Sequence, residues 1–239
     1  MRERYLKKTA LVIALVAFAF PYFVDLRWKF AIGTVLFFAF LKLALGKSWR
    51  KDAGLKIPKR QAWLVLGLTG TLFLISRALI PHLLIGNPIA FVWHEDWVWR
   101  ASPFLQVLNE EIVLRALLLG FLAKQIRSER AISWGAALLF MLLHWLFYRY
   151  NVKGPAFLSP LTLLNLFIFG LVCNSLYLKT RHIGFGFALH AGWNLTRFGG
   201  VYYLDKQLVA EGITFNSIEG SLWLTALMAV FYAGVNRKT

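Results

Sequence analysis

Long apolar blocks constrain this chain more than any other feature of its sequence. Eight hydrophobic stretches follow one another along its 239 residues. A run of about 18 or more apolar residues with few charges is long enough to cross a lipid bilayer as a helix. The sequence therefore predicts an all-α, polytopic membrane protein with about eight transmembrane helices and an intramembrane polar cavity, folded as one domain over residues 1–239.

The composition agrees with this prediction. Hydrophobic residues make up 59% of the chain and charged residues 16%, whereas soluble domains carry about 25% charged residues. The first and the seventh stretches are short for a full crossing, which takes about 20 residues. The predicted segments are Thr9–Val24, Trp28–Leu45, Ala62–Ile85, Pro103–Ala123, Ile132–Tyr148, Pro160–Leu178, Ile183–Phe198 and Ile218–Val235.

The basic residues predict which loops share a side of the membrane. The net charge is +16, but Lys and Arg gather in short loops and at the termini, which argues against a nucleic-acid partner. With a cytoplasmic N-terminus, 17 of the 27 Lys and Arg residues fall on the cytoplasmic side and 7 on the outer side. Because cytoplasmic loops are enriched in Lys and Arg, we expect both termini in the cytoplasm and the chain in a plasma or inner membrane.

Two smaller features concern processing and redox chemistry. The basic run Arg2–Lys8 and the apolar stretch after it resemble a signal peptide, but no small-residue cleavage site follows. The first segment is therefore predicted to be retained. Cys173 is the only cysteine, which excludes an intrachain disulfide and is typical of a small buried hydrophobe.

The fourth segment carries charged residues that hydrocarbon disfavours. An ionisable side chain at mid-membrane costs at least about 2.5 kcal/mol on insertion scales, yet Glu110, Glu111 and Arg115 interrupt an apolar run. Glu111 and Arg115 stand four residues apart and share a helix face, so we predict that they form an ion pair. Glu110 points about 100° away; we expect no partner for it in its own helix, so it either has a partner on another helix or is neutral.

Polar residues on two other segments are candidate partners for Glu110. His144 closes the fifth segment, and His190 and Asn194 lie one turn apart on the seventh. With the predicted orientation, all four residues lie within about 12 Å of the outer ends of their segments, at 1.5 Å per residue. The sequence therefore predicts that they converge in one layer open to the exterior, although a satisfied buried role is the simpler interpretation of either histidine alone.

Several functions fit such a layer. A desolvated carboxylate beside a histidine can activate water as a general base, and a second histidine with an asparagine can donate hydrogen bonds to an oxyanion. Two histidines and two glutamates could also bind zinc, although the usual paired-ligand spacing is absent. A proton-relay transporter and a non-catalytic membrane scaffold or immunity protein stay open as other classes of function.

Three motifs occur in order, each on a hydrophobic segment. They are E-E-x-x-x-R at Glu110, Glu111 and Arg115, F-x-x-x-H at Phe140 and His144, and H-x-x-x-N at His190 and Asn194. Together they resemble the CPBP family, the CAAX proteases and bacteriocin-processing enzymes also called the Abi family, which includes the type II CAAX prenyl endopeptidase. The resemblance covers about residues 103–198.

This resemblance implies a glutamate-dependent intramembrane endopeptidase that uses no metal or other cofactor. Its implied partners are the lipid bilayer and a membrane-associated or lipid-anchored peptide or protein substrate. The outward-facing site favours an exported or membrane-anchored substrate over a cytosolic prenylated one. The implied roles are Glu110 and His144 for water activation, His190 and Asn194 for the oxyanion site, and Glu111, Arg115 and Phe140 for structural support.

Overall fold

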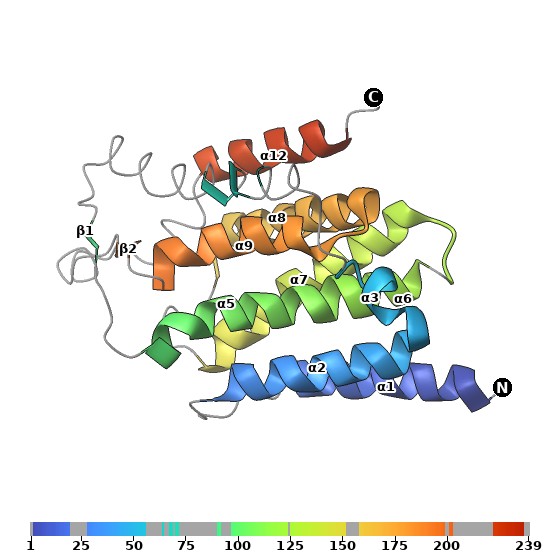
Figure 1. The fold of residues 1–239 in the computed structure, drawn as a ribbon. Helices are drawn as coiled ribbons and strands as arrows, with labels where there is room; N and C mark the ends of the chain where they lie inside the picture. Colours follow the sequence, from blue (N-terminus) through green and yellow to red (C-terminus); the bar gives the residue numbers. More distant parts are fainter. Residues whose placement is uncertain are drawn as a thin grey trace.

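The computed structural model is a bundle of helices (Figure 1). It describes residues 2–19, 28–55, 64, 67–68, 70–71, 90–91, 97–123, 125–151, 158–198, 201–202 and 222–236. The helices are α1 (Arg2–Ala19), α2 (Lys29–Leu45), η2 (Gly46–Ser48), α3 (Trp49–Asp52), α5 (Trp97–Glu111), η3 (Ile112–Leu119), α6 (Gly120–Leu122), α7 (Glu129–Asn151), α8 (Pro160–Thr180), α9 (Ile183–Phe198) and α12 (Leu222–Asn236).

The all-α prediction is confirmed for the described part of the chain. Seven of the eight predicted hydrophobic segments coincide with helices. The remaining segment, Ala62–Ile85, is the third along the chain and lies almost entirely outside the described residues. One small feature was not predicted: β1 (Ala90–Phe91) and β2 (Val201–Tyr202) form a two-residue antiparallel pair.

The continuous helix formed by α5, η3 and α6 runs through the middle of the bundle. The pair α1 and α2 packs on one side of it and α9 on the other, with α8 and α12 beyond α9 (Figure 1). This central helix begins at Trp97, six residues before the predicted start at Pro103. Residues in its middle therefore lie deeper below that end than the sequence predicts.

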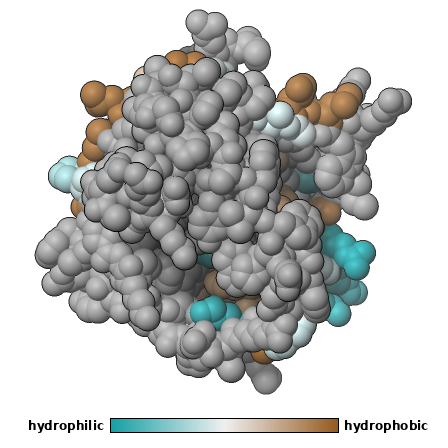
Figure 2. Space-filling model, turned by 90° about the vertical axis from the view of Figure 1, so that its left-hand side faces the viewer, coloured by the Kyte–Doolittle hydropathy of each residue, from teal (hydrophilic) through white to brown (hydrophobic). Residues whose placement is uncertain are grey.

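Two helices among the described residues are long and apolar enough to cross a membrane. They are the run Lys29–Asp52, which joins α2 to α3, and α8. Several other side chains also present apolar surface: on α7, Trp134, Leu138 and Leu142 are exposed. Figure 2 shows brown, hydrophobic side chains on the flanks of the molecule. Exposed apolar faces of this kind mark contact with lipid or with another protein.

Helix ends are defined by local sequence. Ser159 caps α8, because its hydroxyl accepts a hydrogen bond from the Thr162 amide at 3.1 Å, and Pro160 occupies the first turn, where no amide donor is needed. At the other end Arg181 adopts a left-handed conformation with φ 53°, and its amide donates to the Tyr177 carbonyl. The chain then turns directly into α9.

Three basic turns that are predicted to be cytoplasmic meet at one end of the bundle (Figure 1): the segment 46–55 after α2, the α6–α7 loop and the α8–α9 turn. The Ile183 amide donates to the Gly54 carbonyl at 3.2 Å, which joins the α8–α9 turn to the segment after α3. The Tyr177 hydroxyl donates to the Asp52 carbonyl at 3.1 Å. These hydrogen bonds join two parts of the chain that are distant in sequence, the segment around the end of α3 and the α8–α9 turn.

Asparagine side chains connect neighbouring helices inside the bundle. Asn174 of α8 donates to the Ser133 carbonyl of α7 at 2.8 Å. Asn109 of α5 donates to the Phe30 carbonyl of α2 at 2.9 Å and accepts from the Thr34 hydroxyl at 2.7 Å. Hydrogen bonds between helices stabilise bundles in lipid, where the hydrophobic effect does not drive helices together.

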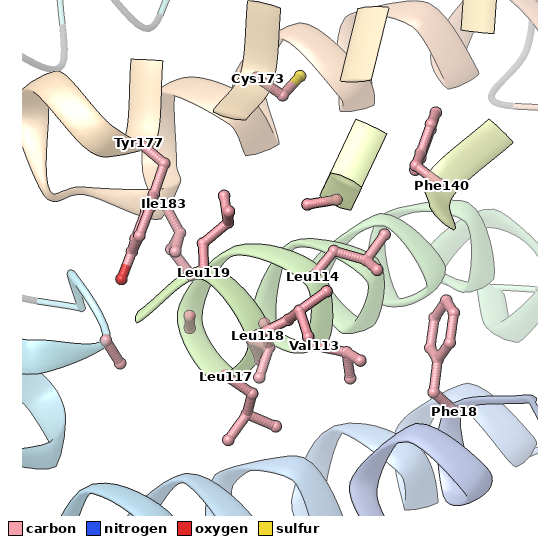
Figure 3. Close-up of a cluster of buried hydrophobic side chains, with 14 of the residues drawn as sticks. Phe18, Val113, Leu114, Leu117, Leu118, Leu119, Phe140, Cys173, Tyr177 and Ile183 are labelled. Carbon is pink, nitrogen blue, oxygen red and sulfur yellow. The ribbon is translucent and has the colours of Figure 1, made fainter. Parts of the chain in front are cut away.

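The apolar core surrounds η3. Leu114, Leu117 and Leu119 extend from this helix toward side chains of the other helices, among them Phe140 and Tyr177 (Figure 3). All eight residues of η3 are buried. The core therefore lies directly beside the charged residues at the end of α5.

Close packing of α7 against α8 depends on Gly170. A Cβ built on this residue would lie 3.1 Å from the Ala137 Cα, which is backbone and cannot turn away. We predict that Gly170→Ala lowers stability by about 1–3 kcal/mol through overpacking, measured as the thermal unfolding midpoint in detergent. Gly135→Ala is the matched control: Gly135 lies on α7, the helix that faces Gly170, and a Cβ added there would have nothing within 4 Å. This variant should not lower the midpoint. Equal midpoints for the two variants would contradict the prediction.

Candidate active site

Two buried glutamates end α5. Glu110 is 1% exposed and Glu111 0%. Directly after them the helix widens into the π-helix η3, in which the Gly120 amide donates to the carbonyl of Arg115, five residues back. π-helical segments inside α-helices occur frequently at functional sites. The charged residues of the fourth predicted segment thus lie where the helix geometry changes.

The predicted ion pair is confirmed. Arg115 Nη1 lies 3.0 Å from Glu111 Oε1, and both side chains are almost fully buried. The guanidinium also lies over the Phe140 ring of α7, 5.1 Å from its centroid. A cation over an aromatic face is attracted by the ring quadrupole. Arg115 therefore connects its own helix to α7.

His190 of α9 lies between the two carboxylates. Its Nδ1 is 3.1 Å from Glu111 Oε1, and its Nε2 is 3.4 Å from Glu110 Oε2. Two carboxylates and one guanidinium leave one negative charge unbalanced in a buried cluster, which is costly. Both ring nitrogens of His190 face carboxylate oxygens, so His190 connects α9 to both glutamates of α5.

Glu110 has partners on three helices. Gln106 Nε2 donates to Glu110 Oε1 at 3.1 Å, so the expectation that Glu110 finds no partner in its own helix is wrong. Gln106 stands four residues earlier, one helical turn away on the same face. His144 of α7 lies on the other side, with its Nε2 3.9 Å from Glu110 Oε2.

The backbone sets the orientation of His144. Its Nδ1 lies 2.9 Å from the Phe140 carbonyl. A carbonyl oxygen can only accept a hydrogen bond, so Nδ1 carries the hydrogen. In the neutral ring Nε2 is then an acceptor, and it faces Glu110. His144 is also the most exposed member of the cluster, at 20% of its side chain.

Aromatic rings hold the two imidazoles in place. Phe140 packs on His144 at 4.3 Å and edge-on against His190 at 5.7 Å between ring centroids. Phe169 of α8 packs edge-on against His190 at 5.2 Å, and Trp193 packs on Phe169 at 4.9 Å. The predicted supporting role of Phe140 thus has a structural basis, and Phe169 adds a second ring.

The structure brings three of the four predicted catalytic residues into contact. Glu110, His144 and His190 form the cluster described above. Asn194 is buried one turn beyond His190 on α9, but among the described residues it makes no hydrogen bond or ion pair with the other three. Its convergence with them stays a prediction.

The sequence interpretation missed two residues of this site, Gln106 and Phe169. Gln106 could have been found, because an amide four residues before a buried carboxylate is a natural partner. Phe169 gave no signal, since an aromatic residue in an apolar helix is ordinarily core. Within the part of the chain that the structure describes, no three His, Cys, Asp or Glu side chains are grouped so as to hold a metal ion.

Residues 92–196 match the protein family described as type II CAAX prenyl endopeptidase, Rce1-like. The matched segment runs from just before α5 to near the end of α9 and contains all three sequence motifs. The resemblance predicted from those motifs is therefore confirmed. No curated protein and no solved structure matches the chain significantly.

Two arginine–glutamate pairs allow a matched test of the buried ion pair. Arg115→Ala would leave Glu111 buried beside His190 without its guanidinium, and breaking a buried pair costs about 3–5 kcal/mol. Arg181 and Glu129 form a pair of similar length, 2.9 Å, but are 50% and 60% exposed, and exposed pairs contribute about 0–1 kcal/mol.

We predict that Arg115→Ala strongly lowers the yield of folded protein and the thermal unfolding midpoint, whereas Arg181→Ala changes them little. Size-exclusion profiles and thermal unfolding in detergent provide the measurement. If Arg115→Ala behaves like Arg181→Ala, the buried pair has no structural role.

Proposed function

We propose that this chain, whose residues 92–196 match the Rce1-like family of type II CAAX prenyl endopeptidases, is a glutamate-dependent intramembrane endopeptidase. The substrate proposed is a membrane-associated or lipid-anchored peptide or protein. The observation that carries the proposal is the contact of Glu110 with two histidines from different helices, inside a buried cluster.

The separation of Glu110 from His144 supports activation of water. At 3.9 Å their facing atoms are too far apart for a direct hydrogen bond. Both atoms are acceptors when Glu110 is ionised and His144 is neutral. A water molecule at about 2.8 Å from each would donate one hydrogen to each atom. Its oxygen lone pairs would then point away from both, toward a substrate carbonyl.

The proposed hydrolysis balances without a covalent intermediate. Glu110 takes a proton from the water as the oxygen attacks the scissile carbonyl carbon. The resulting oxyanion accepts hydrogen bonds from Asn194 and from His190 Nε2, one turn apart on α9. In the resting site Nε2 faces the Glu110 carboxylate, and it is released when Glu110 takes the proton. The proton on Glu110 then passes to the leaving amine as the C–N bond breaks, which regenerates the carboxylate.

The membrane arrangement belongs to the same proposal. We place about eight transmembrane helices around an intramembrane polar cavity, with both termini in the cytoplasm. The exposed apolar side chains of α7 and the gathering of the basic turns at one end of the bundle support this placement. Charged residues inside a membrane face the interior of the bundle and mark functional sites, which fits the burial of Glu110 and Glu111.

We predict that Glu110→Gln abolishes hydrolysis, with a fall of at least about 100-fold, because the amide cannot accept the proton. The protein would be reconstituted in phospholipid vesicles and given a quenched fluorogenic peptide with an S-farnesylated C-terminal CAAX sequence. Membranes from cells that express the wild type or the variant would also be compared for accumulated uncleaved peptides. Glu129→Gln, which removes an exposed carboxylate outside the site, is the control and should retain activity.

The same assay separates the alternatives. A wild type that cleaves no peptide, and whose membranes match those of Glu110→Gln, would indicate a scaffold or immunity protein. Loss of activity with a chelator and its return with zinc would indicate a metalloprotease.

The side of the membrane from which the site opens can be tested by cysteine labelling. Ser48 lies in η2, at the end of the bundle with the basic turns, and Ser102 lies in the first half of α5, toward the other end. In a Cys173→Ser background we predict that an impermeant reagent applied from outside labels Ser102→Cys and not Ser48→Cys. This result follows from the enrichment of Lys and Arg in cytoplasmic loops.

Labelling of the Ser48→Cys variant alone would reverse the orientation and favour a cytosolic substrate. The Cys173→Ser background without an added cysteine controls for reaction elsewhere. Labelling of both variants after membrane permeabilisation controls for their reactivity.

A further inference from the structure

We propose that Gly186 is a positioning residue of the active site: because it has no side chain, the Glu111 carboxylate can lie against α9 and hold His190 in place. This inference rests on the proposed hydrolytic function and assigns a role to a residue outside the three motifs. Gly186 stands one helical turn before His190 on α9.

The space at Gly186 is filled by the carboxylate. A Cβ built on Gly186 would lie 2.4 Å from Glu111 Oε2 and 3.2 Å from its Cδ. Carbon and oxygen atoms that touch without a covalent bond stay about 3.3 Å or more apart. Any residue with a side chain at this position therefore has to displace the carboxylate.

The carboxylate cannot move without loss of its other contacts. Glu111 Oε1 lies 3.0 Å from Arg115 Nη1 and 3.1 Å from His190 Nδ1. Its Oε2 is the oxygen that lies against Gly186 of α9, and it has no hydrogen-bond partner among the described residues. On the remaining side, the Cys173 Cβ would be 3.7 Å from the added methyl group. A displaced Glu111 would release His190 Nδ1, and the ring would no longer be held toward Glu110.

Gly186 differs in this respect from Gly170 and Gly192. At Gly170 and Gly192 the added Cβ would meet backbone, the Ala137 Cα at 3.1 Å and the Gly70 carbonyl at 2.7 Å. Substitution there forces helices apart. At Gly186 the nearest atom is the end of a side chain, so the cost falls on the site and not on helix packing. Glycine inside a helix is less favourable than alanine by about 1 kcal/mol, so helix stability does not explain Gly186.

The test is a double-mutant cycle between Gly186→Ala and Glu111→Asp in the vesicle assay with the farnesylated peptide. Since a misplacement of about 1 Å can cost about 100-fold in rate, we expect Gly186→Ala to lower kcat by about that factor with little change in KM. Glu111→Asp shortens the side chain by one methylene and withdraws the carboxylate from α9. In that background Gly186→Ala should change kcat less than about 3-fold, because the clash is gone.

Gly135→Ala, with open space around its Cβ, controls for the general effect of alanine in a helix and should leave kcat unchanged. The folded yield and thermal midpoint of all variants form a second readout, which does not need activity. If Gly186→Ala folds poorly, it should lower the yield less in the Glu111→Asp background than in the wild-type background.

Two results would overturn the inference. One is an unchanged kcat in Gly186→Ala. The other is an equal effect of Gly186→Ala on kcat, yield and midpoint whether or not Glu111→Asp is present. Failure of the proposed function looks different, because wild type and Glu110→Gln would then hydrolyse the peptide alike. In that case the double-mutant cycle, measured by folded yield and thermal midpoint, still decides whether Gly186 makes room for Glu111.

Discussion

The buried ion pair between Glu111 and Arg115 is the contact on which the rest of the site depends. A guanidinium this deep in a bundle needs a counter-charge, and Glu111 supplies it at 3.0 Å. The oxygen that faces Arg115 also faces His190 of α9, and the guanidinium lies over Phe140 of α7. One pair thus orients side chains from two further helices, so the stability of the bundle and the geometry of the site are coupled.

From this pair a chain of contacts runs across the bundle to the partly exposed His144. Several of its buried polar groups face a group that reduces their cost: His190 faces both carboxylates, and Glu110 accepts from Gln106 on its second oxygen. In lipid such groups have to face the interior of the bundle. Lipid therefore explains both the apolar exterior and the charged interior of the bundle. The polar cluster lies in the interior, where its charged groups can face one another and not hydrocarbon.

Much of this arrangement could be predicted from the sequence, because its causes are local. Apolar length defined the helices, and the spacing of Glu111 and Arg115 defined their pair. The remainder depends on how helices rotate against one another. That His190 bridges both carboxylates follows from the rotation of α9 against α5, and the π-helix η3 has no residue signature. The contact of Gly186 with Glu111 is equally tertiary. The structure describes few residues of the predicted segment Ala62–Ile85, so that prediction is untested.

The depth of the site changes what its orientation implies. The central helix runs from Trp97 to Leu122, so Glu110 lies near its middle, about 20 Å from either end at 1.5 Å per residue. The sequence places Glu110 only about 10 Å below the outer end, because the predicted segment begins at Pro103. A scissile bond has to reach half-way through the bundle from either side. The depth of the site therefore restricts which substrates can reach it more than the side of the membrane does. This depth favours a substrate that the bilayer holds at the level of Glu110, as it would hold the proposed membrane-anchored peptide.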